Sequence, residues 1–194
     1  MKPSDIREHL PVLRDLAKNC ESVIEIRSRE HISTWAILLG LAENNGDFRS
    51  YLGISRFAFA KKDLVHIKDL CESIGISCIC LHRNDINIDL PYADMLFIDS
   101  IHTYCHLTYE LELLSSRIEK FIVIHDTSSP WGNADDMEYD GDYSEYPANF
   151  DRTKKGLWPA VEDFLLVHPE WNLVERRFNC HGLTILERRI LDRS

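Results

Sequence analysis

The 194-residue chain lacks any apolar run near the roughly 20 residues that a membrane-spanning helix needs. Its N-terminus also lacks the pattern of a secretory signal peptide. An excess of positive charge is missing too, because 22 basic and 32 acidic residues give a net charge of −10. These features argue against a membrane protein and against a broad surface for nucleic acid or anionic lipid.

The chain has six cysteines but no C-x-x-C pair. Several of them lie in apolar segments, so we interpret them as free thiols of a reducing compartment, which predicts a cytoplasmic protein. Zinc is the weaker alternative. His102 and His106 stand four residues apart on an expected helix, but no third ligand is evident, and we expect His106 along the helix surface.

Two apolar runs in the middle of the chain, Met95–Ile98 and Phe121–Ile124, each stop at polar residues. Short runs of this kind are typical of buried parallel strands. Between them, apolar residues recur at helical spacing: Leu107, Leu111, Leu114 and Ile118. The pattern predicts a strand–helix–strand unit with a right-handed crossover. Four polar residues then fall at the carboxyl ends of the strands, where open α/β sheets bind ligands: Asp99, His102, His125 and Asp126.

Strand and helix patterns alternate along the rest of the chain. A first helix is expected from Asp5 to about Asn19, with Pro11 marking a kink or a restart. Further strands are expected at 22–26, 49–54 and 76–81, helices at 33–44, 64–74 and 156–168, and a closing antiparallel hairpin at 171–178 and 183–188. This order predicts one doubly wound, three-layer α/β domain over residues 1–194.

One segment, Thr127 to Lys155, has no apolar periodicity. It carries seven carboxylates: Asp135, Asp136, Glu138, Asp140, Asp142, Glu145 and Asp151. A loop of this length inside a compact domain is usually functional or disordered. We therefore expect an acidic lid over residues 127–155.

Five stretches spread along nearly the whole chain carry a family resemblance: VIEIRSREHISTWAILLGL, LFIDSIHTY, FIVIHDT, GLWPAVEDFL and NCHGLTILER. They resemble the class I S-adenosylmethionine-dependent methyltransferases, in particular the metal-dependent sugar O-methyltransferase and cephalosporin-hydroxylase-like branch. The resemblance implies a Rossmann-like fold, with a mostly parallel seven-stranded sheet and helices on both faces. It also implies a methyl donor over the ends of strands one to three, with metal and acceptor over strands four and five.

For the metal half, the resemblance implies that Asp99, His125 and Asp126 bind a divalent cation, with His102 as the general base. The residue types fit this chemistry, because carboxylates suit Mg²⁺ or Mn²⁺ and histidine titrates near neutrality. A bound cation would lower the pKa of an acceptor hydroxyl. In a simpler interpretation, the same residues are solvated strand ends with locally hydrogen-bonded histidines.

For the donor half, the resemblance implies that the cofactor S-adenosylmethionine is bound by Glu25, Arg27, Ser33, Ser55 and Asp85. Three positions depart from the family pattern. Arg27 replaces the glycine of the usual E-x-G, His31 stands where a second glycine is common, and Ser55 replaces an acidic residue that binds ribose hydroxyls. If the donor binds as in the family, the Arg27 guanidinium either points away from it or pairs with its carboxylate; otherwise Arg27 blocks the site.

The sequence therefore predicts an S-adenosylmethionine-dependent, Mg²⁺- or Mn²⁺-assisted O-methyltransferase that acts on a sugar or small polyol. Two alternatives assume a degenerate donor site. One is a metal-dependent enzyme of other chemistry, such as glycosyl transfer or hydrolysis, and the other is a non-catalytic binding protein. The expected partner is a small-molecule or carbohydrate acceptor, without nucleic acid or membrane, and a homo-oligomer is a further possibility.

Overall fold

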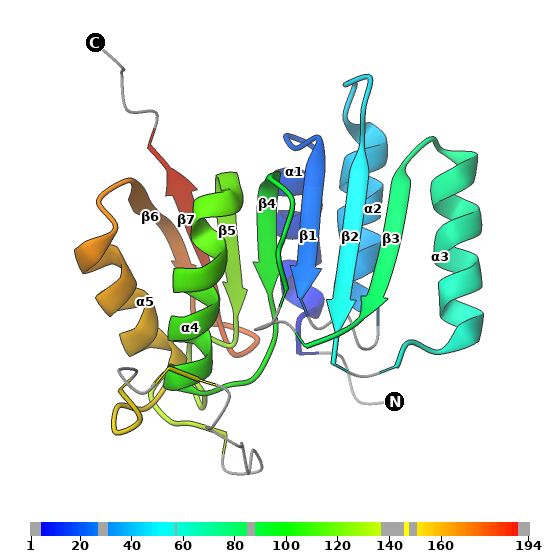
Figure 1. The fold of residues 1–194 in the computed structure, drawn as a ribbon. Coiled ribbons are helices and arrows are strands. Elements are labelled where there is room, and N and C mark those ends of the chain that lie inside the picture. The colour runs from blue at the N-terminus through cyan, green and yellow to red at the C-terminus, as the bar shows by residue number, and fades with distance from the viewer. Residues whose placement is uncertain are drawn as a thin grey trace.

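The computed structural model describes residues 5–26, 31–56, 58–84, 88–136, 146–147 and 151–189. In this part of the chain, seven strands form one sheet in the order β3-β2-β1-β4-β5-β7-β6 (Figure 1). The strands are β1 (Ser22–Ile26), β2 (Ser50–Ser55), β3 (Ser77–His82), β4 (Ala93–Ile98), β5 (Ile118–His125), β6 (Trp171–Arg177) and β7 (Leu183–Arg188). Strands β1 to β5 pair in parallel, and β7 runs antiparallel to both β5 and β6.

Helices cover both faces of the sheet (Figure 1). They are α1 (Leu10–Ala17), α2 (Ile32–Glu43), α3 (Lys61–Ser73), α4 (Tyr104–Leu114) and α5 (Leu157–Val167), with short 3-10 turns η1 (Arg7–His9) and η3 (Ser115–Arg117). Helices α1, α2 and α3 share one core with the sheet, and α4 and α5 share the other. The predicted fold is therefore confirmed: a doubly wound, mostly parallel sheet of seven strands with a C-terminal antiparallel hairpin.

The end of the central helix differs from the expectation. Ile118 was expected on the central helix, and this is wrong: η3 ends that helix, and Ile118 begins β5, where it pairs with Ala93 of β4. The restart expected at Pro11 is confirmed, because the first helix is divided into η1 and α1. Pro11 lies in the first turn of α1, where its missing N–H leaves no hydrogen bond unmade.

The central strands are apolar on both faces, as parallel strands covered by two helix layers must be. In β4, Leu96 packs into the core with α4 and α5, and its neighbour Phe97 packs into the core with α1 and α2. Ile122 and Val123 alternate in the same way in β5. The ends of β4 and β5 are therefore held from both sides, which makes them rigid supports for the polar residues that follow.

Helices α1 and α2 pack closely at Gly40. A Cβ atom on Gly40 would overlap the Arg14 carbonyl oxygen and lie 2.7 Å from the Cβ of Ala17. We expect Gly40→Ala to lower the free energy of unfolding by about 1–3 kcal/mol, because the two helices must move apart. Urea unfolding measures this change. Leu39→Ala, at an exposed position of the same helix, is the control and should shift stability much less. An unchanged unfolding midpoint in Gly40→Ala would contradict the close packing.

The described parts of the acidic segment contain turns and irregular backbone. Its beginning is packed: Thr127 and Ser128 are buried. Asp135 links the segment to the starts of α4 and α5, because its Oδ1 accepts hydrogen bonds from the backbone N–H groups of Tyr104 and Gly156. Residues 137–145 and 148–150 lie outside the described residues, so the lid stays a prediction.

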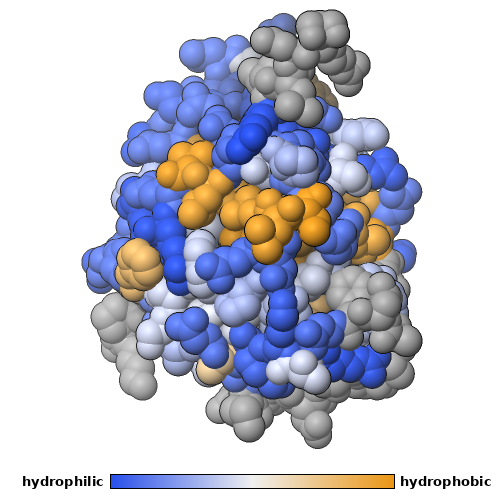
Figure 2. Space-filling view, turned by 90° about the vertical axis from the view of Figure 1, so that its left-hand side faces the viewer, coloured by the Kyte–Doolittle hydropathy of each residue, from blue (hydrophilic) through white to orange (hydrophobic). Residues whose placement is uncertain are grey.

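Two surface features bear on the expected partners. Apolar side chains gather on the face formed by α5 and β6 (Figure 2), where Leu166, Val167, Leu173 and Val174 are exposed. The homo-oligomer stays a prediction. Among the described helices, none combines the length and apolar character needed to cross a membrane.

Candidate metal centre and donor-side residues

The four polar residues predicted at the ends of the central strands do come together. Asp99 directly follows β4, His125 is the last residue of β5, and Asp126 follows it. The Nδ1 atom of His125 lies 3.5 Å from Asp99 Oδ1, and the Nε2 atom of His102 lies 2.9 Å from Asp126 Oδ2. The register of the parallel pair β4–β5 sets this arrangement, because Ile98 pairs with Ile124 and both strands end at the same edge of the sheet.

Asp126 is the centre of this cluster. Its side chain is only 3% exposed, and its backbone is in the left-handed region with φ of 61°. The Asp126 N–H donates a hydrogen bond of 3.0 Å to the carbonyl oxygen of Gly182, which holds this uncommon conformation. Non-glycine residues in the left-handed region are infrequent and concentrate at functional sites.

The orientation of His125 follows from one backbone contact. Its Nε2 atom lies 3.1 Å from the carbonyl oxygen of Cys180, which can only accept, so Nε2 carries the proton. The other ring nitrogen, Nδ1, then faces the carboxylates of Asp99 and Asp126, at 3.5 and 3.3 Å. Such a hydrogen bond to the outer nitrogen is how proteins orient a histidine that binds a metal.

His102 is held just before helix α4. Thr103 caps the helix, because its side-chain oxygen accepts from the His106 N–H. The carbonyl oxygen of His102 accepts a 2.8 Å hydrogen bond from the Asp136 N–H, and its ring stacks on Trp131 with 5.5 Å between ring centroids. The ring therefore has one orientation, with Nε2 turned toward Asp126.

The pKa values of the cluster are set by competition between burial and charge. Burial alone would lower the pKa of the two histidines, but the carboxylates of Asp126 and Asp99 raise it to about 9 for His102 and to about 10 for His125. Burial alone would raise the pKa of the two carboxylates, but their hydrogen bonds to His102 and His125 lower it. The pKa of Asp99 falls to about 2, and that of Asp126 is held well below its usual value. Without a cation, both imidazoles are protonated at neutral pH, and binding a metal through His125 must release a proton.

The residues present fit a divalent cation. One oxygen or nitrogen from each of Asp99, His125 and Asp126 lies within 4.8 Å of the others. Within the described chain, Asp126 Oδ1 is buried without a hydrogen bond, and the buried His125 Nδ1 faces only the carboxylates of Asp99 and Asp126. Buried polar atoms rarely stay unpaired. Two carboxylates and one imidazole form a donor set suited to Mn²⁺ or Mg²⁺.

His106 corrects one expectation. It was expected on the helix surface, but it is fully buried, and its ring packs edge-on against the ring of Tyr146. Its Nδ1 atom lies 2.7 Å from the Tyr146 hydroxyl, and its Nε2 atom lies 3.3 Å from Glu110. His106 thus has partners away from His102, which removes support for a zinc site on this pair. The six cysteines are free, as predicted.

On the donor side, Glu25 is completely buried at β1, among hydroxyl groups of the protein itself. Its Oε1 atom accepts from Ser33, and its Oε2 atom accepts from Thr34 at 2.7 Å and Tyr51 at 2.5 Å. Burial raises the pKa of Glu25, and these three hydrogen bonds oppose the rise. Both carboxylate oxygens are therefore engaged inside the protein, and donor binding by Glu25 and Ser33 stays a prediction.

Of the remaining donor-side positions, the structure describes Ser55 and His31. Ser55 ends β2 and is buried, whereas Arg27 and Asp85 lie outside the described residues. His31 begins α2 in the left-handed conformation, with φ of 57°, and its buried ring stacks on Phe59. Neither ring nitrogen of His31 has a hydrogen bond within the described part of the chain. An imidazole thus fills a position where the family pattern has glycine.

No family model and no curated protein matches the sequence. Solved structures do match. A Corynebacterium glutamicum protein is 15% identical with a TM-score of 0.64, over 99% of this chain and 85% of its own. A putative caffeoyl-CoA O-methyltransferase from Staphylococcus aureus is 14% identical with a TM-score of 0.55, over 94% and 84%. An O-methyltransferase from Bacillus cereus, in complex with S-adenosylhomocysteine, is 11% identical with a TM-score of 0.54, over 94% and 81%. The chain has the Rossmann-like methyltransferase fold.

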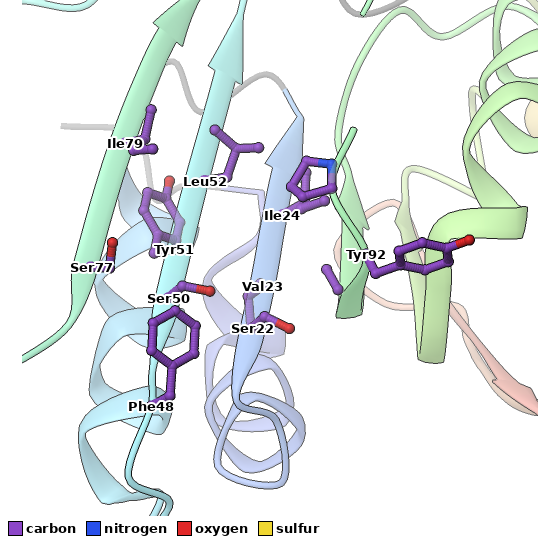
Figure 3. A pocket seen from close by; sticks show the side chains of 12 residues that line it. Ser22, Val23, Ile24, Phe48, Ser50, Tyr51, Leu52, Ser77, Ile79 and Tyr92 are labelled. Atoms are coloured by element: carbon purple, nitrogen blue, oxygen red, sulfur yellow. The ribbon is translucent and has the colours of Figure 1, made fainter. Parts of the chain in front are cut away.

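A hollow lies on the half of the sheet away from the candidate metal centre (Figure 3). It has a volume of about 220 Å³ and lies over β1 to β3, where apolar side chains such as Ile24, Leu52 and Ile79 line it. Its lower rim holds the first residues of these strands: Ser22, Ser50 and Ser77. The candidate centre lies at the other end of the strands. The hollow therefore has no part in it.

Sequence reasoning missed three residues near the centre. His181 Nδ1 lies 3.3 Å from Asp126 Oδ1 and 3.9 Å from Asp5 Oδ2, and the buried ring of His9 packs edge-on against His125. The sequence analysis placed His181 between the two strands of the closing hairpin. Nothing local showed that this loop reaches the end of β5.

Proposed function

We propose that the chain catalyses divalent-metal-assisted transfer of a methyl group from S-adenosylmethionine to a hydroxyl of a sugar or small polyol. The observation that carries the proposal is the convergence of Asp99, His125, Asp126 and His102 at the ends of β4 and β5. Further support comes from the fold, because similar solved structures include O-methyltransferases and two proteins bound to S-adenosylhomocysteine.

Asp99, His125 and Asp126 are the residues that would hold the cation. A cation at this place lowers the pKa of a bound hydroxyl and orients it, which makes the oxygen a better nucleophile. Asp126 and His125 are buried, whereas the Asp99 side chain is 32% exposed. The centre is thus fixed from the protein side and open at Asp99, where an acceptor can approach.

His102 takes the proton of the acceptor hydroxyl at Nε2 in this proposal. A general base must be neutral, but the two carboxylates raise the pKa of His102. Once Asp99 and Asp126 share their charge with a cation, they stabilise the protonated imidazole less. His102 then titrates closer to neutral pH, where it can accept a proton.

The polyhydroxylated acceptor is proposed from two groups that contact His102. Asp136 lies 3.5 Å from His102 Nδ1, and Trp131 stacks on the same ring. Carboxylates accept hydrogen bonds from hydroxyl groups, and an indole face packs against the apolar face of a sugar ring. This combination suits a sugar or small polyol.

A second candidate function is a methyltransferase-fold protein whose donor site is degenerate, acting as a metal-dependent enzyme of other chemistry or as a binding protein. Two observations favour it. Both oxygens of the Glu25 carboxylate accept hydrogen bonds from hydroxyl groups of the protein, and the ring of His31 is buried just before α2. Both features reduce the room and the free polar groups available to a donor.

Calorimetric titration of the donor separates the two candidates. We expect S-adenosylmethionine and S-adenosylhomocysteine to bind below millimolar concentration, with and without Mn²⁺, because the donor site does not include the metal ligands. Adenosine monophosphate serves as the control for non-specific binding of an adenine group. An absence of donor binding at millimolar concentration would end the methyltransferase proposal and favour the second candidate.

A further inference from the structure

We propose that Asp126 bridges two cations, and that a second divalent cation binds between Asp126, His181 and Asp5. This position goes beyond the proposed methyl transfer, which needs only the cation at Asp99, His125 and Asp126. The two ligand sets have the same composition, each with two carboxylates and one imidazole, and they share Asp126.

The two oxygens of Asp126 face different neighbours. Oδ2 lies 2.9 Å from His102 Nε2 and 3.3 Å from His125 Nδ1, whereas Oδ1 lies 3.3 Å from His181 Nδ1. Asp5 completes the second group, because one ligand atom from each of Asp5, Asp126 and His181 lies within 4.8 Å of the others. A carboxylate placed between two donor groups in this way is suited to bridging two cations.

Unpaired buried atoms point into the second position. Asp126 is only 2% exposed, and its Oδ1 atom has no hydrogen bond within the described residues. The Nδ1 atom of His181 is also buried and without a hydrogen bond there, although 42% of the side chain is exposed. The two atoms are close but not aligned for a hydrogen bond. A cation between them would satisfy both, which removes the cost of burying unpaired polar atoms.

The turn between β6 and β7 is shaped to present His181. Cys180, His181 and Gly182 have φ values of 46°, 63° and 101°. A side chain at Gly182 would lie 2.6 Å from the Ser128 backbone nitrogen, so only glycine fits the approach of the turn to β5. The same turn orients both imidazoles, because the Cys180 carbonyl oxygen holds His125 of the first ligand set.

The donor atoms indicate the class of cation. A set of two carboxylate oxygens and one imidazole nitrogen favours Mn²⁺ or another first-row ion over Ca²⁺, which takes oxygen ligands alone. The second cation would also join three segments distant in sequence: the N-terminal segment, the end of β5 and the β6–β7 turn.

Counting Mn²⁺ per chain tests this proposal. We expect native mass spectrometry to show two Mn²⁺ per wild-type chain, with an electron paramagnetic resonance signal of an exchange-coupled pair. His181→Ala should bind one Mn²⁺ with an uncoupled signal, and Asp5→Asn should weaken the second position at least several-fold. His66→Ala, an exposed histidine on α3, is the matched control and should still bind two.

Each other result counts against the second position. One Mn²⁺ in wild type that persists in His181→Ala would overturn it and leave the first site standing. Two Mn²⁺ in both His181→Ala and Asp5→Asn would place the second ion elsewhere. No Mn²⁺ in wild type would overturn both sites. Because Asp5 is exposed, Asp5→Asn keeps the test valid if His181→Ala fails to fold.

Discussion

The Asp126→Asn variant should bind Mn²⁺ more than about 100-fold more weakly than the wild type, because a direct ligand contributes at least as much as the outer contacts that already change affinity 10- to 100-fold. Asp126 offers one oxygen to each ligand set, so this single substitution removes a negatively charged ligand from both. Asparagine tolerates the left-handed conformation as well as aspartate does, so the backbone at φ of 61° should be kept. Calorimetric Mn²⁺ titration gives the affinity, and circular dichroism reports the fold.

Asp89→Asn is the control for removing one negative charge. Asp89 is exposed and pairs with Arg117 at the surface, away from the centre. It should bind Mn²⁺ as the wild type does. If Asp126→Asn kept wild-type affinity for Mn²⁺, the metal centre proposed here would be wrong, whatever the donor titration shows.

The His102→Gln variant should lose about 10²- to 10⁴-fold in the rate of methyl transfer, the usual contribution of a general base. Glutamine has a similar size and can hydrogen bond, but it cannot take a proton near neutral pH. Mn²⁺ affinity should stay near that of the wild type, because the ligands Asp99, His125 and Asp126 remain. Single-turnover rates with saturating donor, measured together with Mn²⁺ titration, check both expectations.

The pH profile distinguishes a base from a residue that only supports the centre. The wild-type rate should rise with pH as His102 loses its proton, and this rise should be absent in His102→Gln. His66→Gln should keep both the rate and the profile. An unchanged rate in His102→Gln would exclude it as the base, whereas a parallel loss of Mn²⁺ would make it a ligand.

The strand ends could be predicted because the information is local. Met95–Ile98 and Phe121–Ile124 are short apolar runs that stop at polar residues. This pattern is typical of parallel strands that are buried on both faces. Since neighbouring parallel strands end at one edge of the sheet, the gathering of Asp99 and Asp126 followed from the chain order alone. The structure has the same pairing, with Ile98 opposite Ile124.

Other features could not be predicted because distant segments decide them. Ile118 continues the helical spacing of Leu107, Leu111 and Leu114, but pairing with Ala93 draws it into β5. His106 was expected on the helix surface, but it is buried, and the ring of Tyr146, distant in sequence, packs against it. The hydroxyls that surround Glu25 come from α2 and β2, and only their packing brings them to one carboxylate.

By itself, the sequence determined the layer architecture and the polar ends of β4 and β5, since apolar periodicity and chain order carry both. Only the tertiary structure decided that Asp5 and His181 join Asp126. Strand β7 pairs with β5 and leaves β6 at the edge, with Leu183 opposite His125. The turn before β7 therefore lies at the carboxyl end of β5. Local sequence does not encode this contact, because strand order depends on how the last hairpin packs against the rest of the sheet.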